Sequence, residues 1–245
     1  SIRYAERIQR AMLPSEDTFP ETFILYMPKD IVSGDFYWMY DNGELQFIAA
    51  CDCTGHGVPG AFMSIIGHNS LDKVVREYGI TRPGPILDQL NTEIVNVLMQ
   101  RHEETIKDGM DMALISFDRK KFIMEFAGAY NPLYVVRQGE LFTYKSDRFP
   151  IGMSSQIIKK SFQTQIVDIR PGDMVYMSSD GYADQFGSVS AKKYKSGNVK
   201  KLLCEIWNLP VNDQRARLEK EILDWKGDYP QIDDIMFIGT KIPEI

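Results

Sequence analysis

The sequence predicts an α+β fold in which two packed, mainly antiparallel β-sheets are flanked by pairs of helices. Its strand-like runs fall into two blocks and its helical patterns come in pairs, whereas a parallel sheet would require strict alternation of strand and helix. Turn-forming residues separate neighbouring strand-like runs, as expected for hairpins. With 245 residues, 44% of them hydrophobic, the chain is long enough for one large core. We therefore expect one domain at residues 14–245, preceded by a linker or regulatory helix at residues 1–13.

The first expected element is this short helix, which ends before Pro14. Ala5, Ile8 and Met12 share one helical stripe, with charged residues on the other faces. Because the chain does not start with methionine, we interpret the helix as the tail of a linker or coiled-coil stalk behind an upstream module. An ordinary helix packed on the domain explains the same pattern equally well.

Three strand-like runs follow the first helix, and two helical patterns come after them. Asp41, Asn42 and Gly43 supply turn residues between the second and third runs and predict a hairpin. Pro83 and Gly84 separate the two helices. The expected strands cover residues 23–27, 35–40 and 45–51, and the expected helices cover residues 60–77 and 85–100.

A second block of strands precedes a second pair of helices and a last strand. The polar, lysine-containing stretch at residues 188–201 is expected to be a mobile, solvated loop in front of that helix pair. The expected strands cover residues 112–117, 122–126, 133–136, 141–144, 162–167, 174–177 and 235–239, and the expected helices cover residues 199–207 and 213–225.

Charge and composition argue against several classes of protein. The formal net charge of −6 does not suit a nucleic-acid binder, whose affinity would depend on a basic face. No uninterrupted run of 18 apolar residues occurs, so no membrane-spanning helix is expected. The 3 cysteines and 3 histidines lack the spacing of a zinc site, and disulfides are not expected, which favours a reducing cytoplasm.

The positions of four aspartates carry most of the functional information. They lie beside glycine or at the ends of apolar runs, at Asp35, Asp52, Asp180 and Asp233. A single aspartate in such a place usually belongs to a turn or a helix cap. If the four converge, each pair at about 4 Å repels by about 4 kcal/mol at an effective dielectric constant of about 20. Convergence would therefore require cations between the carboxylates.

Oxygen ligands without histidine favour hard cations, Mn²⁺ or Mg²⁺, over zinc. Two such ions could bridge a water molecule, lower its pKa and hold the phosphoryl oxygens that the resulting hydroxide attacks. A protein nucleophile would then be unnecessary. The residues by themselves thus indicate phosphate ester hydrolysis at a two-metal site.

Other catalytic motifs are absent or incomplete in this sequence. There is no Gly-x-Ser-x-Gly elbow and no reactive-cysteine phosphate loop. Gly55, Gly57 and Gly60 match the dinucleotide-binding pattern between a strand and a helix. The next expected element is a second helix, so the strand-helix-strand unit is missing and nucleotide binding is not favoured.

Several short motifs together make the chain resemble the metal-dependent PPM-type phosphatases, specifically their SpoIIE/RsbU-like bacterial branch. The resemblance extends over almost the whole chain, and the order and number of the motifs make it specific. It implies a β-sandwich flanked by helix pairs, with a two-metal centre that hydrolyses phosphoserine or phosphothreonine. The motifs are Ile8 to Pro14, Ser33 to Tyr37, Cys51 to Ala61, Ala127 to Pro132, Phe149 to Gly152, Pro171 to Asp173, Ser179 to Gly181 and Asp233 to Ile235.

The resemblance also assigns metal-binding roles residue by residue. It implies that the four aspartates at positions 35, 52, 180 and 233 bind two Mn²⁺ or Mg²⁺ ions. Cys53 would add a backbone carbonyl where many relatives have glycine. A third, weaker metal would involve Asp108 or Asp111, between which the motif does not discriminate.

The chain departs from the eukaryotic members of the fold in its substrate-handling residues. Those members carry a histidine, thought to act as the general acid, where this chain has Thr54. His56 is a candidate acid by proximity, although it also suits a helix start. The phosphate-gripping arginine has no clear counterpart, and Lys29 is the nearest basic residue.

In the bacterial branch, such domains follow sensory, coiled-coil or response-regulator modules and act on phosphorylated STAS-type anti-anti-sigma factors. The resemblance therefore implies a phosphoprotein substrate of this type, an upstream module, and a homodimer formed through the N-terminal helix. It implies a cytoplasmic location, which includes the cytoplasmic domain of a larger, even membrane-bound, protein. Two alternatives stay open: a catalytically silent binding module with the same fold, and a small-molecule phosphatase or phosphodiesterase.

Overall fold

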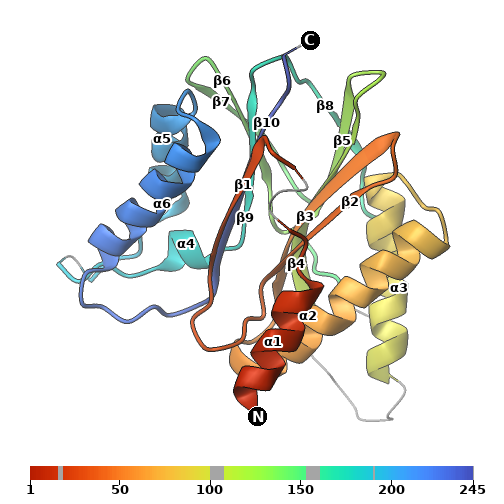
Figure 1. Cartoon of the computed structure of the whole chain (residues 1–245), viewed down its shortest axis with the longest axis horizontal. Coiled ribbons are helices and arrows are strands. Elements are labelled where there is room, and N and C mark those ends of the chain that lie inside the picture. Colours follow the sequence, from red (N-terminus) through yellow and green to blue (C-terminus); the bar gives the residue numbers. More distant parts are fainter. Residues whose placement is uncertain (16–18, 100–107, 153–160, 190, 245) are drawn as a thin grey trace.

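Two β-sheets packed face to face form the centre of the molecule, with helices on both outer sides (Figure 1). The computed structural model describes residues 1–15, 19–99, 108–152, 161–189 and 191–244. Within these ranges each sheet has 5 strands, all paired antiparallel. The predicted fold class, an α+β sandwich with helix pairs outside two antiparallel sheets, is confirmed.

The first sheet has the order β2-β3-β4-β5-β8. The predicted hairpin joins β2 to β3, and the Asn42 side chain accepts the backbone N–H groups of Glu44 and Leu45 to stabilise its turn. The run predicted at residues 162–167 forms a strand only in its second half. The strands are β2 (Phe36–Asp41), β3 (Leu45–Cys53), β4 (Met110–Asp118), β5 (Ile123–Ala129) and β8 (Gln165–Val167).

The second sheet has the order β1-β10-β9-β6-β7. Its last strand, β10, lies between β1 and β9, so the first and the last strand along the described chain pair with each other. The strands are β1 (Thr22–Met27), β6 (Leu133–Arg137), β7 (Glu140–Tyr144), β9 (Met174–Ser178) and β10 (Ile235–Lys241).

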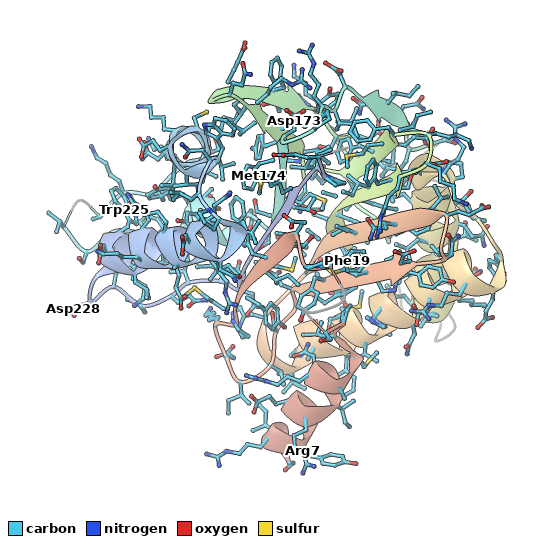
Figure 2. All side chains as sticks on the ribbon, turned by 45° about the horizontal axis from the view of Figure 1, so that its top comes forward. Arg7, Phe19, Asp173, Met174, Trp225 and Asp228 are labelled. Carbon is cyan, nitrogen blue, oxygen red and sulfur yellow. The ribbon has the colours of Figure 1, made fainter. Side chains whose placement is uncertain are left out.

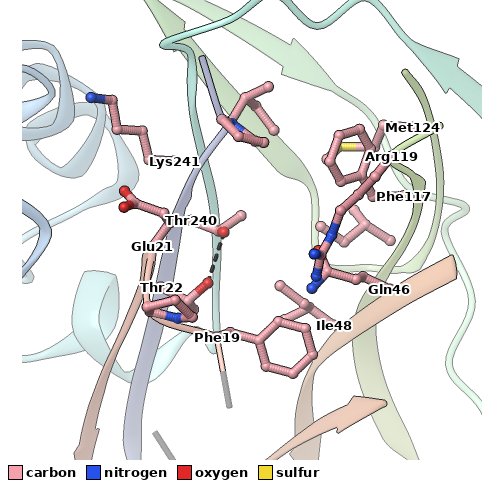
Figure 3. Close-up of a pocket in the computed structure, with 14 residues that line it drawn as sticks. Phe19, Glu21, Thr22, Gln46, Ile48, Phe117, Arg119, Met124, Thr240 and Lys241 are labelled. Carbon is pink, nitrogen blue, oxygen red and sulfur yellow. Dashed lines mark hydrogen bonds between the residues drawn. The ribbon is translucent and has the colours of Figure 1, made fainter. Parts of the chain in front are cut away.

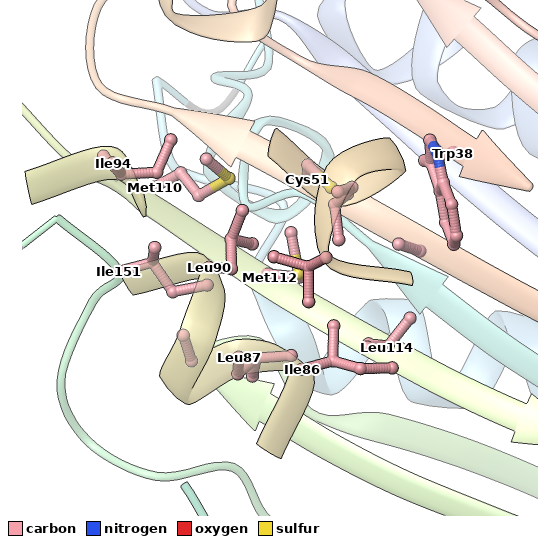
Figure 4. Packing of buried hydrophobic residues seen from close by; sticks show 14 of the residues in the cluster. Trp38, Cys51, Ile86, Leu87, Leu90, Ile94, Met110, Met112, Leu114 and Ile151 are labelled. Carbon is pink, nitrogen blue, oxygen red and sulfur yellow. The ribbon is translucent and has the colours of Figure 1, made fainter. Parts of the chain in front are cut away.

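The central strands are buried on both faces because each sheet packs against helices as well as against the other sheet. Along β4, Met112 and Leu114 face α3, whereas Ala113 and Ile115 face the second sheet. Figure 4 shows Leu90 and its neighbours on α3 packed against the strands of the first sheet. On the other side, α5 and α6 cover Tyr176 and Phe237. The result is three apolar layers that hold the strand ends rigidly.

The five predicted helices are present in the predicted order with shifted ends, and the short helix α4 was not predicted. The first long helix starts three residues before the predicted one and finishes in a π-helical turn, Lys73–Glu77. Residue 100, predicted to end the second helix, lies outside the described residues. The helices are α1 (Ile2–Met12), α2 (Gly57–Asp72), α3 (Pro83–Met99), α4 (Gly181–Asp184), α5 (Ser196–Ile206) and α6 (Val211–Lys226). None of these described helices has the length and hydropathy to cross a membrane.

The structure corrects the bounds of one expected segment and adds a detail to another. The helix expected from residue 199 starts three residues earlier, so residues 196–198, expected only in the solvated loop, already belong to α5. In α1 the predicted stripe is not the buried face: Ile8 is 42% exposed, and Gln9 is the residue of this helix that is buried. The helix projects from the sandwich, with Arg7 at its periphery (Figure 2).

Candidate metal centre

The strand registers bring the predicted aspartates to one end of the sandwich. Phe36 pairs with Cys51, so Asp35 and Asp52 are neighbours at the adjoining ends of β2 and β3. Asp52 pairs with Asp111 across β3 and β4. In the facing sheet, Ser178 pairs with Phe237, which places Asp180 and Asp233 just beyond the ends of β9 and β10. These registers place the four aspartates at the same end of the sandwich.

Burial and mutual repulsion raise the pKa values of four carboxyl groups in this acidic group, those of Asp35, Asp52, Asp111 and Asp180. Asp35 is 2% exposed, and desolvation together with the charge of Asp52 raises its pKa well above the usual range. Desolvation and the charge of Asp180 raise the pKa of Asp52 to about 8. The same two causes raise the pKa of Asp111 to about 6. The pKa of Asp180 is also raised, by desolvation, by Asp184 and then by Asp233. The carboxylates of this group therefore interact electrostatically with one another.

The group is chemically suited to a divalent cation. Oδ2 of Asp35 is buried without a hydrogen-bond partner, which is costly for a carboxylate unless a proton or a cation occupies that position. The side-chain donors are carboxylate oxygens, the ligands that Mg²⁺ and Mn²⁺ prefer. Among the described residues, however, no three acidic, histidine or cysteine side chains already surround one point. The carboxylates would have to lie closer together to hold a cation jointly.

Close backbone packing positions the Asp35 loop beside β3. A Cβ atom at Gly34 would collide with the carbonyl oxygen of Gly55 and lie 3.1 Å from that of Cys53. The Cys53 side chain is buried in the apolar layer under α2 and α3, while its carbonyl faces the loop. This orientation agrees with a backbone carbonyl as the group that Cys53 could offer.

Gly181 has the same role next to Asp180. A Cβ atom at Gly181 would collide with the carbonyl oxygen of Asp234, so only glycine allows α4 to start this close to β10. The glycines beside Asp35 and Asp180 are therefore explained by tight backbone contact near the carboxylates.

Asp234 is a structural residue of the site that the sequence reasoning missed. It is 3% exposed, and its two carboxylate oxygens accept the backbone N–H groups of Lys29 (2.7 Å) and Gly34 (2.8 Å). Asp234 therefore ties the loop that carries Asp35 to the start of β10. The sequence signal for this role was the pair Asp233-Asp234 directly before a strand. Neighbouring side chains of an extended chain point in opposite directions, so only one of two adjacent carboxylates can point into the protein.

The structure distinguishes the two candidates for a third metal. Asp111 lies opposite Asp52, and its charge contributes to the raised pKa of Asp52. Asp108 is exposed and lies before β4 begins, outside the paired register. Of the two, Asp111 belongs to the acidic group.

Thr54, His56 and Lys29 differ in what they contact. The Thr54 hydroxyl donates to the carbonyl of Gly109 (2.9 Å) and accepts its N–H (3.0 Å). It therefore satisfies both backbone groups of the residue just before β4. Lys29 Nζ lies 3.0 Å from His56 Nε2. His56 Nδ1 lies 2.9 Å from a carboxylate oxygen of Asp30, a residue that the sequence reasoning did not single out.

An apolar cavity of about 230 Å³ lies elsewhere, between the sheets at the opposite strand ends (Figure 3). It is lined by the first residues of β1 and β3 and the last residues of β4 and β10, including Phe19, Ile48, Phe117 and Thr240. None of the aspartates discussed above lines it. The cavity is therefore separate from the candidate metal centre.

Comparisons with known proteins agree with this fold and site. The family model "Stage II sporulation protein E (SpoIIE)" matches residues 42–243. The structure of the SiaA-PP2C domain of Pseudomonas aeruginosa superposes with a TM-score of 0.88 at 30% identity, covering 98% of this chain and 95% of that one. The phosphatase domain of SpoIIE from Bacillus subtilis shares the fold, with a TM-score of 0.72 at 21% identity over 91% of this chain and 61% of that one.

A curated sequence relative is phosphoserine phosphatase RsbU of Bacillus subtilis (strain 168). It is 26% identical over 189 residues, which are 75% of this chain and 53% of RsbU. The chain thus spans about half the length of this relative. Fold and relatives together place the chain in the PP2C class of domains. Within that class, the chain belongs to the SpoIIE family.

Proposed function

We propose that this chain is a metal-dependent serine/threonine phosphatase domain, acting on phosphoserine or phosphothreonine of a partner protein. The observation that carries the proposal is the buried, unpartnered Oδ2 of Asp35 beside Asp52, whose own pKa is raised by burial and by the charge of Asp180. A like-charged group of this kind stabilises the folded state only when cations or protons compensate it.

The proposed ligands are Asp35, Asp52, Asp180 and Asp233, with the backbone carbonyl of Cys53. Two Mn²⁺ or Mg²⁺ ions held there would supply a deprotonated water as the nucleophile and neutralise phosphoryl charge. A third ion would involve Asp111. A structure of RsbX in complex with magnesium shares this fold at 12% identity and a TM-score of 0.61, which suits a magnesium-type site without assigning its residues.

Lys29 and His56 are proposed to contact the substrate. The Lys29 ammonium would bind a phosphoryl oxygen, because its backbone is held by Asp234 in the same loop as Asp35. Asp30 accepts the Nδ1 proton of His56, which leaves Nε2 to accept a hydrogen bond from the Lys29 ammonium 3.0 Å away. Once Lys29 turns to a phosphoryl oxygen, a proton on Nε2 could be passed to the departing seryl oxygen. Thr54 is assigned no proton transfer, since its hydroxyl is engaged by Gly109.

The partners are proposed from the relatives. RsbU is named a phosphoserine phosphatase, and the fold also occurs in a protein with both RsbU and RsbW domains and in a structure from the bacterial stressosome. We infer a phosphorylated STAS-type protein as the substrate and an upstream sensory or coiled-coil module. Tyr4 and Ile8, four residues apart on the exposed side of α1, suit a homodimer contact through this helix. A cytoplasmic location fits the free thiols of Cys51, Cys53 and Cys204.

The test is hydrolysis of p-nitrophenyl phosphate with Mn²⁺, Mg²⁺ or EDTA by the wild type, Asp52→Ala and Asp180→Ala. Metal-dependent turnover that both variants lose would support the proposal. A phosphoserine protein should then be a better substrate than nucleotides or sugar phosphates, which separates it from a small-molecule phosphatase. Mn²⁺ binding with no turnover of any of these substrates would favour the catalytically silent binding module.

A further inference from the structure

The β5–β6 corner, residues 130–132, carries the chain from one sheet to the other at the end of the sandwich that holds the acidic group. Ala129, the last residue of β5, pairs with the residue that follows Asp111 in β4. The start of β6 lies beside the end of β9, because these strands are antiparallel, and β9 ends two residues before Asp180. The corner is therefore one strand away from each of these two aspartates.

The backbone of the corner is strained at Tyr130. Its φ is 57°, in the left-handed region that favours glycine. The N–H of Asn131 donates to the carbonyl oxygen of Ala129 (2.6 Å), which closes a γ-turn of the rare, strained form around Tyr130. The Tyr130 N–H donates to the carbonyl oxygen of Asp147 (2.8 Å), whose own N–H donates to the carbonyl oxygen of Gly128 (2.9 Å). Backbone hydrogen bonds on both sides thus fix the strained conformation.

Another aromatic residue with a left-handed backbone shows how packing can offset such strain. Phe122 has a φ of 55°, and its ring meets that of Phe117 edge to face, with 5.8 Å between the centroids, at the edge of the inter-sheet core. Tyr130 is 49% exposed, and within the described residues its ring has no aromatic partner and its hydroxyl no hydrogen bond. The Nδ2 of Asn131 is also buried there without a hydrogen-bond partner. Strain and an unsatisfied donor without compensation are typical of functional positions.

The ring of Tyr130 suits contact with a protein that carries the phosphate. In the first sheet, Asp35, Asp52 and Asp111 lie at the ends of β2, β3 and β4, and Tyr130 follows the next strand, β5. A phosphoserine held at the acidic group would place the residues beside it over an adjoining strand end. A tyrosine held rigidly there offers a large apolar surface with little loss of side-chain freedom, as in the centres of protein interfaces.

We propose that Tyr130 is a substrate-contact residue, whose ring packs against an apolar side chain next to the phosphoserine of a protein substrate. This inference rests on the proposed function in placing the phosphoserine at the acidic group. The contact would favour phosphoproteins over small phosphate esters, which do not reach the β5–β6 corner.

The test compares kcat/KM of the full chain and of Tyr130→Asn for p-nitrophenyl phosphate and for a peptide with leucine on both sides of a phosphoserine. Asparagine removes the ring and adopts the left-handed backbone more readily than most residues, so the turn is kept. We expect kcat/KM to fall by about tenfold for the peptide, through KM, and by less than about twofold for p-nitrophenyl phosphate. Tyr130→Phe keeps the ring and should retain most of the activity toward the peptide. Tyr130→Gly, which also accepts this backbone, provides the measurement if Tyr130→Asn does not fold.

Gln138 offers a matched control at the other end of β6. It is exposed, has a φ of 50° and lies in the turn between β6 and β7. Gln138→Asn should leave kcat/KM unchanged for both substrates. The Kd for Mn²⁺ should be the same in the wild type and in all of these variants, since none of them changes a proposed ligand.

An unchanged kcat/KM for the peptide in folded Tyr130→Asn, or an equal loss for both substrates, would overturn the contact. A wild type that hydrolyses p-nitrophenyl phosphate but not the peptide would overturn it as well. If the wild type hydrolyses neither, the proposed function fails, and the Kd of the fluorescently labelled peptide, measured by anisotropy, tests the contact by itself. That Kd should rise by about tenfold in Tyr130→Asn, and an equal Kd or no binding by the wild type would overturn the contact.

Discussion

Single atoms decide much of the geometry beside the aspartates. Gly34, Gly60 and Gly181 lie where a Cβ atom would collide with backbone, in contacts that join the Asp35 and Asp180 loops to their neighbours. The carboxylates themselves come from segments far apart in the chain. Their separation is therefore sensitive to a shift of a few tenths of an ångström in these loops.

Gly34→Ala should weaken Mn²⁺ binding and lower the free energy of unfolding by about 1–3 kcal/mol, the usual cost of overpacking. The added methyl group would push the loop away from the Gly55 carbonyl and move Asp35 with it. Gly197→Ala is the control, because nothing lies within 4 Å of that position and it belongs to α5. Calorimetry with Mn²⁺ and thermal unfolding would check both, and equal behaviour of the two variants would contradict this account.

Lys29→Gln should raise the KM for p-nitrophenyl phosphate by about tenfold, since a charge-assisted hydrogen bond contributes about 1.5–3 kcal/mol. The KM of Lys29→Arg should be closer to that of the wild type, because the arginine side chain is also positively charged. The Kd for Mn²⁺ should stay unchanged in both. Steady-state kinetics with Lys220→Gln on α6 as the control would check this, and a wild-type KM in Lys29→Gln would exclude the phosphate contact.

At the scale of elements, the β3–β4 register makes the site acidic. Asp52 and Asp111 are directly opposite each other, an arrangement that is unfavourable for two ionised side chains. A slip of one residue would turn the two side chains to the other faces of their strands. The register itself is held by the buried apolar residues that precede Asp52 in β3 and follow Asp111 in β4.

Asp111→Asn should raise the melting temperature of the metal-free protein at pH 8 by about 1–3 °C, since it removes like-charge repulsion of about 0.2–1 kcal/mol. Asp108→Asn should leave the melting temperature unchanged, because Asp108 lies outside the paired register. Thermal unfolding in EDTA measures both. If Asp108→Asn stabilised the protein and Asp111→Asn did not, Asp108 and not Asp111 would belong to the acidic group.

At the scale of the whole molecule, the acidic group links stability to pH and to metal. The pKa of Asp52 is about 8 in the folded protein against an ordinary value of 3.8, so the folded state binds the extra proton between these values. Its contribution to stability is therefore full near pH 4 and is lost as the pH rises toward 8. The raised pKa of Asp111 has the same effect: its contribution to stability is lost as the pH rises toward about 6. A cation that replaces these protons should reverse the loss.

The increase in melting temperature on adding Mn²⁺ should therefore be larger at pH 8 than at pH 5.5. In EDTA, the melting temperature of the wild type relative to that of Asp52→Asn should fall over the same interval. Thermal unfolding of both proteins at three pH values checks the sign. A relative melting temperature that rises with pH would show that Asp52 is not held in a proton-binding environment.

The sequence alone determined the fold class and most strand positions, because periodicity and turn chemistry are local. It also pointed to four aspartates as candidate metal ligands, because the motifs stand in a recognisable order. It placed Asp35 and Asp52 at strand ends, and antiparallel pairing then brings such ends together. Helix ends and the start of α5 were less accurate, since they depend on packing between elements.

Tertiary structure alone decided what contacts the site. The roles of Asp30 and Asp234, and the choice of Asp111 over Asp108, follow from contacts between residues up to 205 positions apart. No local pattern distinguishes a buried aspartate that holds a loop from an exposed one in a turn. Polar side chains obtain their function from their partners, and in this protein folding brings those partners together from distant parts of the chain.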